Sequence, residues 1–309
     1  MKAIVMNQYG GPDVLKLAED APEPKVGPDF VLVRVKAAGV NPVDWKIREG
    51  RLDGLFPTDF PVVPGWDLAG VVERVGPAVS EFSPGDEVIG YVREDHVGRG
   101  TYAELVSAPV RTLGRKPARL SWAEAGGLPL AGLTAYQALV KALGVNEDDT
   151  VLIHAASGGV GSFAVQIALA RGARVIGTAG PRNHDHLRSL GAEPVAYGPG
   201  LADEVRRLAP GGVSAALDLV GGEALEVTPK LLTGKGRWAS IVDPSVTERG
   251  GRYVFVRPDP TDLAALARLV DDGRLTVPVA KTFPLAEAAE AQRLSAEGHT
   301  RGKIVLTVD

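Results

Sequence analysis

A glycine-rich turn between an apolar run and a helix-like segment is the strongest chemical signal in this sequence. Residues 150–161 read Thr-Val-Leu-Ile-His-Ala-Ala-Ser-Gly-Gly-Val-Gly, and helix-like sequence continues to Arg171. Small residues in such a turn let the backbone approach a pyrophosphate, and the free N–H groups of the helix then face the anion. The turn therefore predicts dinucleotide binding. Its candidate cofactor contacts are Ala155, Ser157, Gly158, Gly159, Val160 and Gly161.

The strand that follows bears on which nucleotide is bound. Residues 174–180 contain no acidic residue, although NAD-binding relatives of this fold carry one roughly 20 residues beyond the glycines. Arg182 and Asn183 come next in the chain. A cation and neutral donors accept a 2′-phosphate that a carboxylate would repel. The segment favours NADPH, with Thr178 and Arg182 as candidate contacts. The alternative is an Arg182 that is merely solvated on a loop.

Composition limits the class of function. The 309 residues suit two packed domains rather than one small core. With 34 Lys and Arg against 38 Asp and Glu, the net charge of −4 offers no general attraction to nucleic acid or anionic membranes. No apolar run approaches the ~18 residues of a spanning helix, and the first residues form no signal-peptide core. We expect a cytoplasmic protein that has neither nucleic acid nor a membrane as its partner.

The absence of cysteine excludes disulfides, thiolate catalysis and cysteine-ligated zinc. His184 and His186 are the only histidines close together in the chain, and a solvated helix start explains them better than a metal site. We therefore expect no metal.

Two patterns of elements must position these residues. Up to about residue 120, short strands alternate with Gly and Pro, which is typical of a β-rich module. Its candidate strands are 2–6, 30–38, 67–75, 86–91 and 101–106. From about residue 122, helices and strands alternate, as in a parallel doubly wound sheet. Helices are expected at 122–143, 160–171, 184–190, 201–209, 223–233 and 260–273, and strands at 150–154, 174–178, 194–197, 215–220, 237–242 and 253–256.

These patterns predict an α/β protein with a Rossmann doubly wound parallel sheet and a second, β-rich domain. The β-rich domain is expected to span 1–121 and to be completed by 274–309, where a helix near 285–297 and a strand at 303–308 fold back onto it. The Rossmann domain is expected at 122–273. Ligands of such sheets bind at the carboxyl ends of the strands, and we expect the site in the cleft between the two domains.

Several motifs in order along the chain resemble those of the medium-chain dehydrogenase/reductase superfamily, specifically its zinc-independent quinone oxidoreductase branch, which includes ζ-crystallin-like proteins. They are Ala-Gly-Val-Asn-Pro-Val-Asp at 38–44, Pro-Gly-Trp-Asp-Leu-Ala-Gly at 64–70 and the glycine turn, with further matches at 82–88, 132–136, 218–222 and 302–305. The resemblance implies a GroES-like N-terminal substrate domain, a Rossmann domain, NADPH dependence and commonly a homodimer.

The sequence departs from zinc alcohol dehydrogenases of that superfamily at two positions. Asn41 stands where those relatives have a ligating cysteine, and Trp66 stands where they have a ligating histidine. An indole cannot ligate zinc and an amide is a poor ligand. Without a Lewis acid, a saturated carbonyl is poorly activated. A quinone or an α,β-unsaturated carbonyl needs only hydrogen-bond donors at the oxygen that becomes negative.

The resemblance implies three candidate catalytic residues, two within the motif at 38–44 and one just after it. Asn41 is the leading donor to the substrate oxygen and also a cofactor contact, with an ordinary turn residue as the alternative. Asp44 is expected to order the loop through backbone or arginine contacts, with Arg48 as the candidate arginine. Lys46 stands where relatives often have tyrosine, which leaves the proton donor open between the protein and solvent. Candidates for the substrate pocket, or else core aromatics and their neighbours, are Trp45, Leu55, Phe56 and Trp66.

The resemblance also implies cofactor contacts outside the glycine turn. These are Thr134 near the carboxamide, Tyr197 on the adenosine side, Val220 and Gly221 near the nicotinamide ribose, Phe255 by the ring, and Lys303. Tyr197 could equally be a strand aromatic, and Lys303 an exposed charge before a strand. Residues 253–256 could form an edge for pairing with a second subunit or an internal strand.

Three functions are compatible with these observations. The first is an NADPH-dependent reductase that transfers hydride to a quinone or another conjugated carbonyl acceptor. The second is reduction of the C=C bond of enones, 2-alkenals or enoyl thioesters. The third is an NADPH-binding sensor or structural protein with little turnover.

Overall fold

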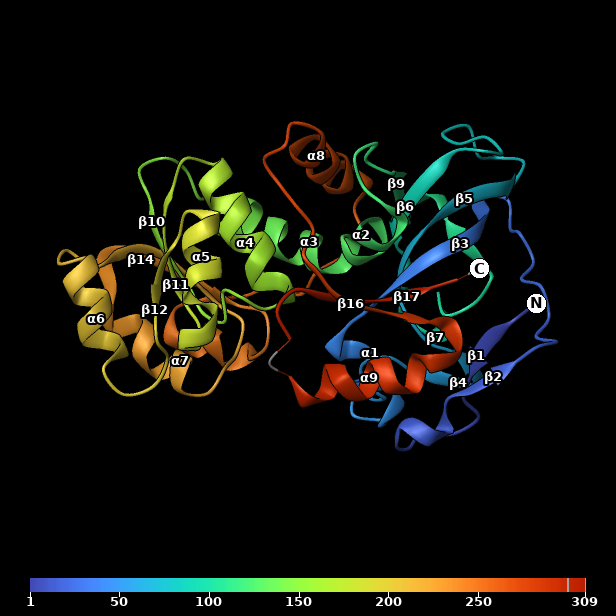
Figure 1. Cartoon of the computed structure of the whole chain (residues 1–309), viewed down its shortest axis with the longest axis horizontal. Helices are drawn as coiled ribbons and strands as arrows, with labels where there is room; N and C mark the ends of the chain where they lie inside the picture. Colours follow the sequence, from blue (N-terminus) through green and yellow to red (C-terminus); the bar gives the residue numbers. More distant parts are fainter. Residues whose placement is uncertain (299, 309) are drawn as a thin grey trace. The chain divides into compact units, whose positions relative to one another are not determined.

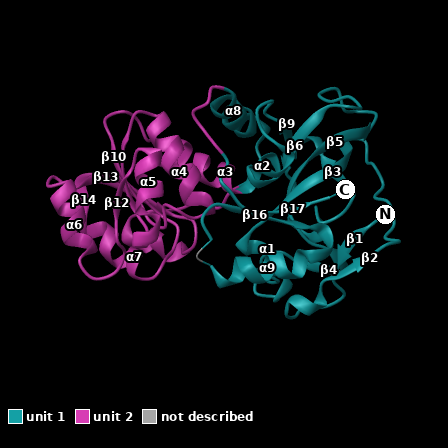
Figure 2. Ribbon diagram, viewed as in Figure 1, with its two compact units in different colours: residues 1–130, 257–271, 277–309 teal, residues 131–256, 272–276 magenta. Residues whose placement is uncertain are grey.

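The computed structural model describes residues 1–298 and 300–308, which form two compact units (Figure 2). Unit 1 comprises Met1–Leu130, Arg257–Asp271 and Val277–Asp309, and unit 2 comprises Ala131–Val256 and Asp272–Thr276. The division differs from the expected one because two helices belong to unit 1. Gly126 of α2 (Trp122–Gly127) lies so close to Ala37 that an added Cβ would be 2.8 Å from that side chain. Likewise, α8 (Pro260–Asp271) packs on β9 (Leu113–Arg115).

Unit 1 is built on a seven-stranded sheet. Its order is β16-β17-β3-β5-β6-β9, with β8 also paired to β3. The strands are β3 (Phe30–Val40), β5 (Asp67–Val75), β6 (Glu87–Tyr91), β8 (Leu105–Pro109), β16 (Val279–Pro284) and β17 (Lys303–Thr307). Two small sheets pair β1 (Ala3–Val5) with β2 (Lys16–Ala18), and β4 (Thr58–Val63) with β7 (Val97–Arg99). Helix α9 (Ala288–Glu297) lies beside α1 (Pro42–Arg48) (Figure 1). Because β17 pairs with β3, the C-terminal segment folds back onto the N-terminal sheet, as the sequence predicts.

Unit 2 has the Rossmann fold that the sequence predicts. Its six strands are parallel in the order β12-β11-β10-β13-β14-β15, which is the doubly wound order. They are β10 (Thr150–Ile153), β11 (Arg174–Thr178), β12 (Glu193–Val195), β13 (Val213–Asp218), β14 (Leu232–Ser240) and β15 (Arg252–Tyr253). The helices include α4 (Gly159–Ala170), α5 (His184–Leu190), α6 (Leu201–Leu208) and α7 (Glu223–Val227). The hydrophobic core against this sheet includes Leu152, Ile176, Ala216 and Trp238.

Several elements differ from the predicted ones, and three of the differences have a local reason. The helix expected at 122–143 is interrupted after α2, because Pro129 starts a new helix, α3 (Pro129–Tyr136), which passes into a π-helix at Gln137–Ala142. The strand expected at 101–106 begins only at Leu105, because the N–H groups of 100–102 bond to the backbone of 63–65. The strand expected at 253–256 is reduced to β15, because its neighbour β14 ends at Ser240.

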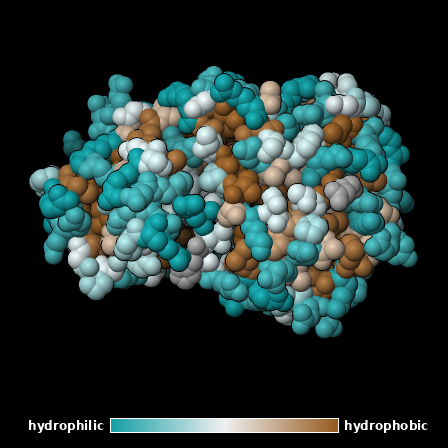
Figure 3. Space-filling view, in the orientation of Figure 1, coloured by the Kyte–Doolittle hydropathy of each residue, from teal (hydrophilic) through white to brown (hydrophobic). Residues whose placement is uncertain are grey.

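Hydrophilic residues predominate on the face shown in Figure 3, and apolar residues appear among them in small groups. No helix within residues 1–298 and 300–308 combines the length and the apolar character needed to cross a membrane.

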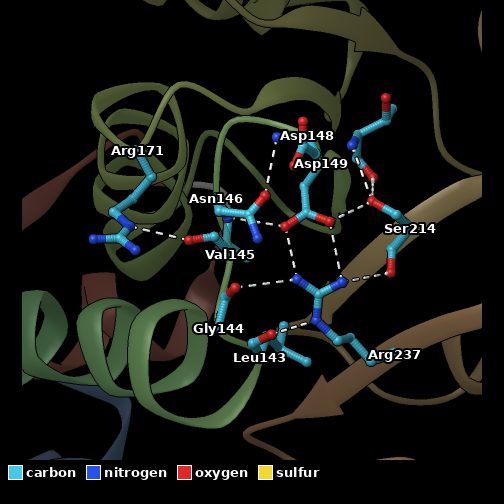
Figure 4. Close-up of polar contacts among 10 residues, drawn as sticks. Leu143, Gly144, Val145, Asn146, Asp148, Asp149, Arg171, Ser214 and Arg237 are labelled. Carbon is cyan, nitrogen blue, oxygen red and sulfur yellow. Dashed lines mark hydrogen bonds and ion pairs between the residues drawn. The ribbon is translucent and has the colours of Figure 1, made fainter.

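A polar network at the amino end of β10 secures the end of the π-helix (Figure 4). Arg237 makes two bonds to Asp149, of 2.7 and 3.0 Å, and also donates to the carbonyls of Leu143 and Gly144. Ser214 donates to Asp149 at 2.6 Å. Burial alone would raise the pKa of Asp149, but the hydrogen bonds from Arg237 and Ser214 outweigh it and lower the pKa. The network links the segment between α3 and β10 to β13 and β14. It lies at the amino ends of the parallel strands, and ligands of such sheets bind at the opposite, carboxyl ends.

Replacing Arg237 with Met should lower the free energy of unfolding by about 2 kcal/mol, less than the 3–5 kcal/mol of a fully buried pair because Arg237 is one-third exposed. Urea unfolding at pH 7 measures this loss. It should shrink as the pH falls through the lowered pKa of Asp149, because protonation removes the pair. Arg74→Met is the matched control, since Arg74 pairs with Glu23 at the exposed surface. Equal losses in both variants would contradict a structural role for this network.

Candidate functional site

The glycine turn of unit 2 has the geometry of a phosphate cradle. Ala155 adopts a left-handed conformation, with φ of 49°, and donates its N–H to Thr178 Oγ1 at 3.0 Å. A Cβ at Gly161 would lie 2.2 Å from the carbonyl oxygen of Ala155, so only glycine lets α4 start this close to the turn. The first N–H groups of α4 lack intrahelical acceptors, as at every helix start. The turn therefore fits a dinucleotide pyrophosphate. The hydroxyl of Thr178 holds this turn in place.

The predicted 2′-phosphate residues gather at the carboxyl end of β11. Asn183 donates to Ser157 Oγ at 3.2 Å, which joins the glycine turn to the short helix that contains Arg182. Tyr197 is 63% exposed, and its hydroxyl lies 3.8 Å from the position that a Cβ on Gly180 would take. Asn183 therefore borders the turn, Arg182 precedes it in the chain, and Tyr197 lies near Gly180. The hydrogen bond between Asn183 and Ser157, and the one between the Ala155 N–H and Thr178, were not expected from the sequence.

A second loop of unit 2 follows β13 and contains Val220 and Gly221. The buried carboxylate of Asp218 accepts the N–H groups of both residues at 2.9 Å. Ser240, at the end of β14, donates to the same carboxylate at 2.6 Å. We did not expect Asp218 or Ser240 to hold this loop, although an Asp three residues before a Gly-Gly pair is a recognisable turn signal. Of the other predicted cofactor contacts, Val220 is exposed, Thr134 is buried and Phe255 is 44% exposed. Phe255 follows β15, which is the edge strand of the sheet rather than an internal strand.

A buried polar cluster in unit 1 contains the leading catalytic candidate. Asn41 follows β3, and the residue is 1% exposed. Its Oδ1 accepts from Lys303 Nζ at 2.5 Å, and its Nδ2 donates to Asp67 Oδ2 at 2.9 Å. The expectation that Lys303 might be an exposed charge is wrong, because β17 places it beside β3. Burial lowers the pKa of Lys303, against the opposing carboxylates of Asp67 and Asp44.

Asp44 lies in the same cluster and is bonded through one oxygen. Its Oδ2 accepts from the Asn41 N–H at 2.7 Å and from the Tyr102 hydroxyl at 2.8 Å. Its Oδ1 has no hydrogen-bond partner among the described residues. Burial raises the pKa of Asp44 to about 7, although both hydrogen bonds oppose the shift. Asp44 thus orders the start of α1 as expected through the backbone, where Pro42 occupies the first helical position.

The expected contact between Asp44 and Arg48 is absent from the described structure. Arg48 instead donates to Gln292 Oε1 at 2.9 Å and to the Gly10 carbonyl at 3.1 Å. Arg48 is one turn beyond Asp44 on α1, a spacing at which side chains can pair, but its guanidinium bonds to Gln292 of α9 instead. Tyr102 takes the place expected for the arginine. No local pattern in the sequence indicated that contact.

The predicted substrate-pocket residues separate into two groups. Phe56 and Trp66 are in the core, with ring centroids 5.2 Å apart, which corresponds to the alternative of core aromatics. Leu55 is 57% exposed. Lys46 Nζ lies 5.6 Å from the centroid of the Trp45 ring, so these two side chains share one patch on α1.

The pKa of Asp44 predicts a pH-dependent stability. A carboxyl with pKa about 7 in the folded protein and 3.8 otherwise binds its proton more tightly when folded. Its contribution therefore falls as the pH rises from about 4 to about 7. Asp44→Asn should remove this dependence, which is on the order of 4 kcal/mol across the window in urea unfolding. Asp148→Asn on the surface serves as the control. A parent and an Asp44→Asn variant with parallel stability–pH curves would refute a shifted carboxyl.

Two family models match the chain. Residues 27–118 match the alcohol dehydrogenase GroES-like domain, and residues 190–306 match a zinc-binding dehydrogenase model. The first match confirms the GroES-like assignment that the resemblance implied.

The described residues near Asn41 do not fit a zinc ion. The chain has no cysteine, and the amide oxygen of Asn41 is occupied by the ammonium of Lys303. A cation bonded at this position repels a second one. Within the described residues, no group of three or more His, Asp or Glu side chains is placed to hold a metal. Trp66 packs on Phe56 and Tyr91 instead.

Relatives and solved structures match over nearly the whole chain. The chloroplast envelope quinone oxidoreductase homolog of Arabidopsis thaliana is 31% identical over 99% of this chain and 98% of its own length. The NADPH-dependent alkenal/one oxidoreductase of the same plant is 33% identical over 99% of this chain and 79% of its own. The quinone oxidoreductase from Coxiella burnetii is 36% identical, covers 100% of this chain and 99% of its own, and superposes with a TM-score of 0.89. The chain therefore belongs to the medium-chain dehydrogenase/reductase superfamily, among its quinone oxidoreductases.

Proposed function

We propose that the protein is an NADPH-dependent oxidoreductase that transfers hydride to a quinone or another conjugated carbonyl acceptor without a metal. The observation that carries the proposal is the cluster of Asn41, Asp67 and Lys303, which offers an amide donor where a zinc enzyme needs ligands. A conjugated acceptor develops its negative charge on an oxygen that one or two donors can stabilise. A simple ketone lacks that route.

Reduced nicotinamide, when bound, supplies the hydride. The glycine turn and the start of α4 would hold the pyrophosphate, and Ser157, Arg182 and Tyr197 would receive the 2′-phosphate and adenosine. The name of the alkenal/one relative, which specifies NADPH, supports this choice of nucleotide. Further cofactor contacts proposed from the resemblance are Thr134, Val220, Gly221 and Phe255.

Three residues are proposed at the reacting centre. Asn41 donates to the developing oxyanion, and Asp44 holds the backbone at Asn41. Lys46 is the side-chain candidate for proton delivery, with solvent as its competitor. The half-buried Trp45 and the exposed Leu55 are proposed to contact the acceptor.

Reduction of an activated C=C bond is the second candidate function. It is supported by the alkenal/one relative and requires the same hydride donor and oxyanion contact. We further propose a cytoplasmic homodimer in which the edge strand β15 pairs with its copy, since the six-stranded sheet ends there.

Arg182→Ala should weaken NADPH binding roughly 10- to 100-fold and leave NADH binding unchanged, because only the 2′-phosphate meets the guanidinium. Fluorescence titration with both nucleotides measures the two Kd values. The control is Arg188→Ala, whose guanidinium pairs with Asp185 on the same exposed helix. A proportional loss for NADPH and NADH would remove the phosphate assignment.

Asn41→Ala should lower kcat about 10²–10³-fold with 9,10-phenanthrenequinone, while Kd for NADPH changes little. Stopped-flow loss of NADPH absorbance should be compared among this quinone, 2-cyclohexenone, a crotonyl thioester and cyclohexanone. We expect turnover of one or more conjugated acceptors and none of cyclohexanone. Efficient reduction of cyclohexanone would overturn the proposed chemistry, and no turnover despite tight NADPH binding would favour a sensor.

A further inference from the structure

We infer that Lys303 and Asp67 are positioning residues, which lock the carboxamide of Asn41 in one orientation and leave a single N–H of that amide available to a ligand. The inference rests on the proposed function, because it assigns both residues to the support of the Asn41 donor. It also gives Lys303 a role different from the cofactor contact that the family resemblance implies.

The chemistry of the two partners decides the orientation. An ammonium can only donate, and an ionised carboxylate can only accept. Lys303 therefore requires Oδ1 of Asn41, at 2.5 Å, and Asp67 requires Nδ2, at 2.9 Å. A flipped amide would set its NH₂ against the ammonium and its oxygen against the carboxylate. In a cluster this deeply buried, the loss of both bonds is costly, so one orientation dominates.

The partners of Asn41 are themselves held by the sheet. Asp67 starts β5, and its other oxygen accepts the Leu130 N–H at 2.7 Å. Lys303 starts β17, and its Nζ is also 3.4 Å from the carbonyl of Val40. The strands β17, β3 and β5 are neighbours in the sheet. The three side chains thus come from one end of three adjacent strands, which makes the cluster rigid.

The remaining capacity of the amide matches an oxyanion. One N–H of Asn41 Nδ2 is used by Asp67, and the other has no acceptor among the described residues. Because Lys303 withdraws electron density through Oδ1, the free N–H becomes a stronger donor. Lys303 consequently acts on a substrate oxygen through Asn41, without touching it.

The test is a double-mutant cycle between Lys303→Met and Asn41→Ala in the full-length protein. With Asn41 present, Lys303→Met should lower kcat for the best conjugated acceptor about 10- to 100-fold. With Asn41→Ala, the same substitution should cost less than about 3-fold. Kd for NADPH should stay within about 3-fold of the parent value. The exposed Lys2→Met is the matched control and should change neither quantity.

A spectroscopic readout is independent of turnover. The two ¹H–¹⁵N signals of the Asn41 carboxamide, identified by their disappearance in Asn41→Ala, should be well separated in the parent because each proton has a different environment. Lys303→Met should move them toward the positions of a free amide, whereas Lys2→Met should not. Unmoved signals in Lys303→Met would overturn the inference.

A second variant covers the case in which Lys303→Met fails to fold, since it leaves buried carboxylates unpaired. Asp67→Asn removes one of those charges at constant volume, and its effect on kcat should also vanish in the Asn41→Ala background. Equal losses with and without Asn41, or a large rise in Kd for NADPH, would refute positioning and favour a structural or cofactor role. If Asn41→Ala itself retains full activity, the proposed donor fails first, and the spectrum alone then decides whether Lys303 orients the amide.

Discussion

The pairing of β17 with β3 is the contact on which the polar cluster of unit 1 depends. It joins residues 262 positions apart and brings the ammonium of Lys303 to the side chain of Asn41. Without this pairing, two buried carboxylates, Asp44 and Asp67, would lack a cation in a region that excludes water. The C-terminal segment is therefore part of the N-terminal domain in the chemical sense as well as the topological one.

In unit 2, hydrogen bonds fix the loops that follow the parallel strands. The supporting groups lie on neighbouring strands rather than in the loops themselves. Thr178 of β11 holds Ala155 in a left-handed conformation, and Ser240 of β14 supports the carboxylate that binds the loop after β13. Each loop is thus pinned by the strand beside its own, so loop geometry is inherited from the sheet.

A common design follows from these two arrangements. Neither Asn41 nor Trp66 is suited to hold zinc, and the amide of Asn41 instead lies between the ammonium of Lys303 and the carboxylate of Asp67. In the mechanism proposed above, the charge of Lys303 polarises the amide of Asn41, which suits acceptors whose developing oxyanion needs only hydrogen-bond donors. The burial that keeps water from this cluster also raises the pKa of Asp44.

The sequence by itself determined the doubly wound parallel sheet, the glycine-rich turn and the β-rich partner domain, because these follow from periodicity, glycine spacing and residue type. Only the tertiary structure decided that Lys303 is buried, that Tyr102 rather than Arg48 bonds Asp44, and that Phe56 and Trp66 lie in the core. Local patterns carry φ preferences and amphipathic faces. They do not carry strand register between distant segments, and register decides which buried charges meet.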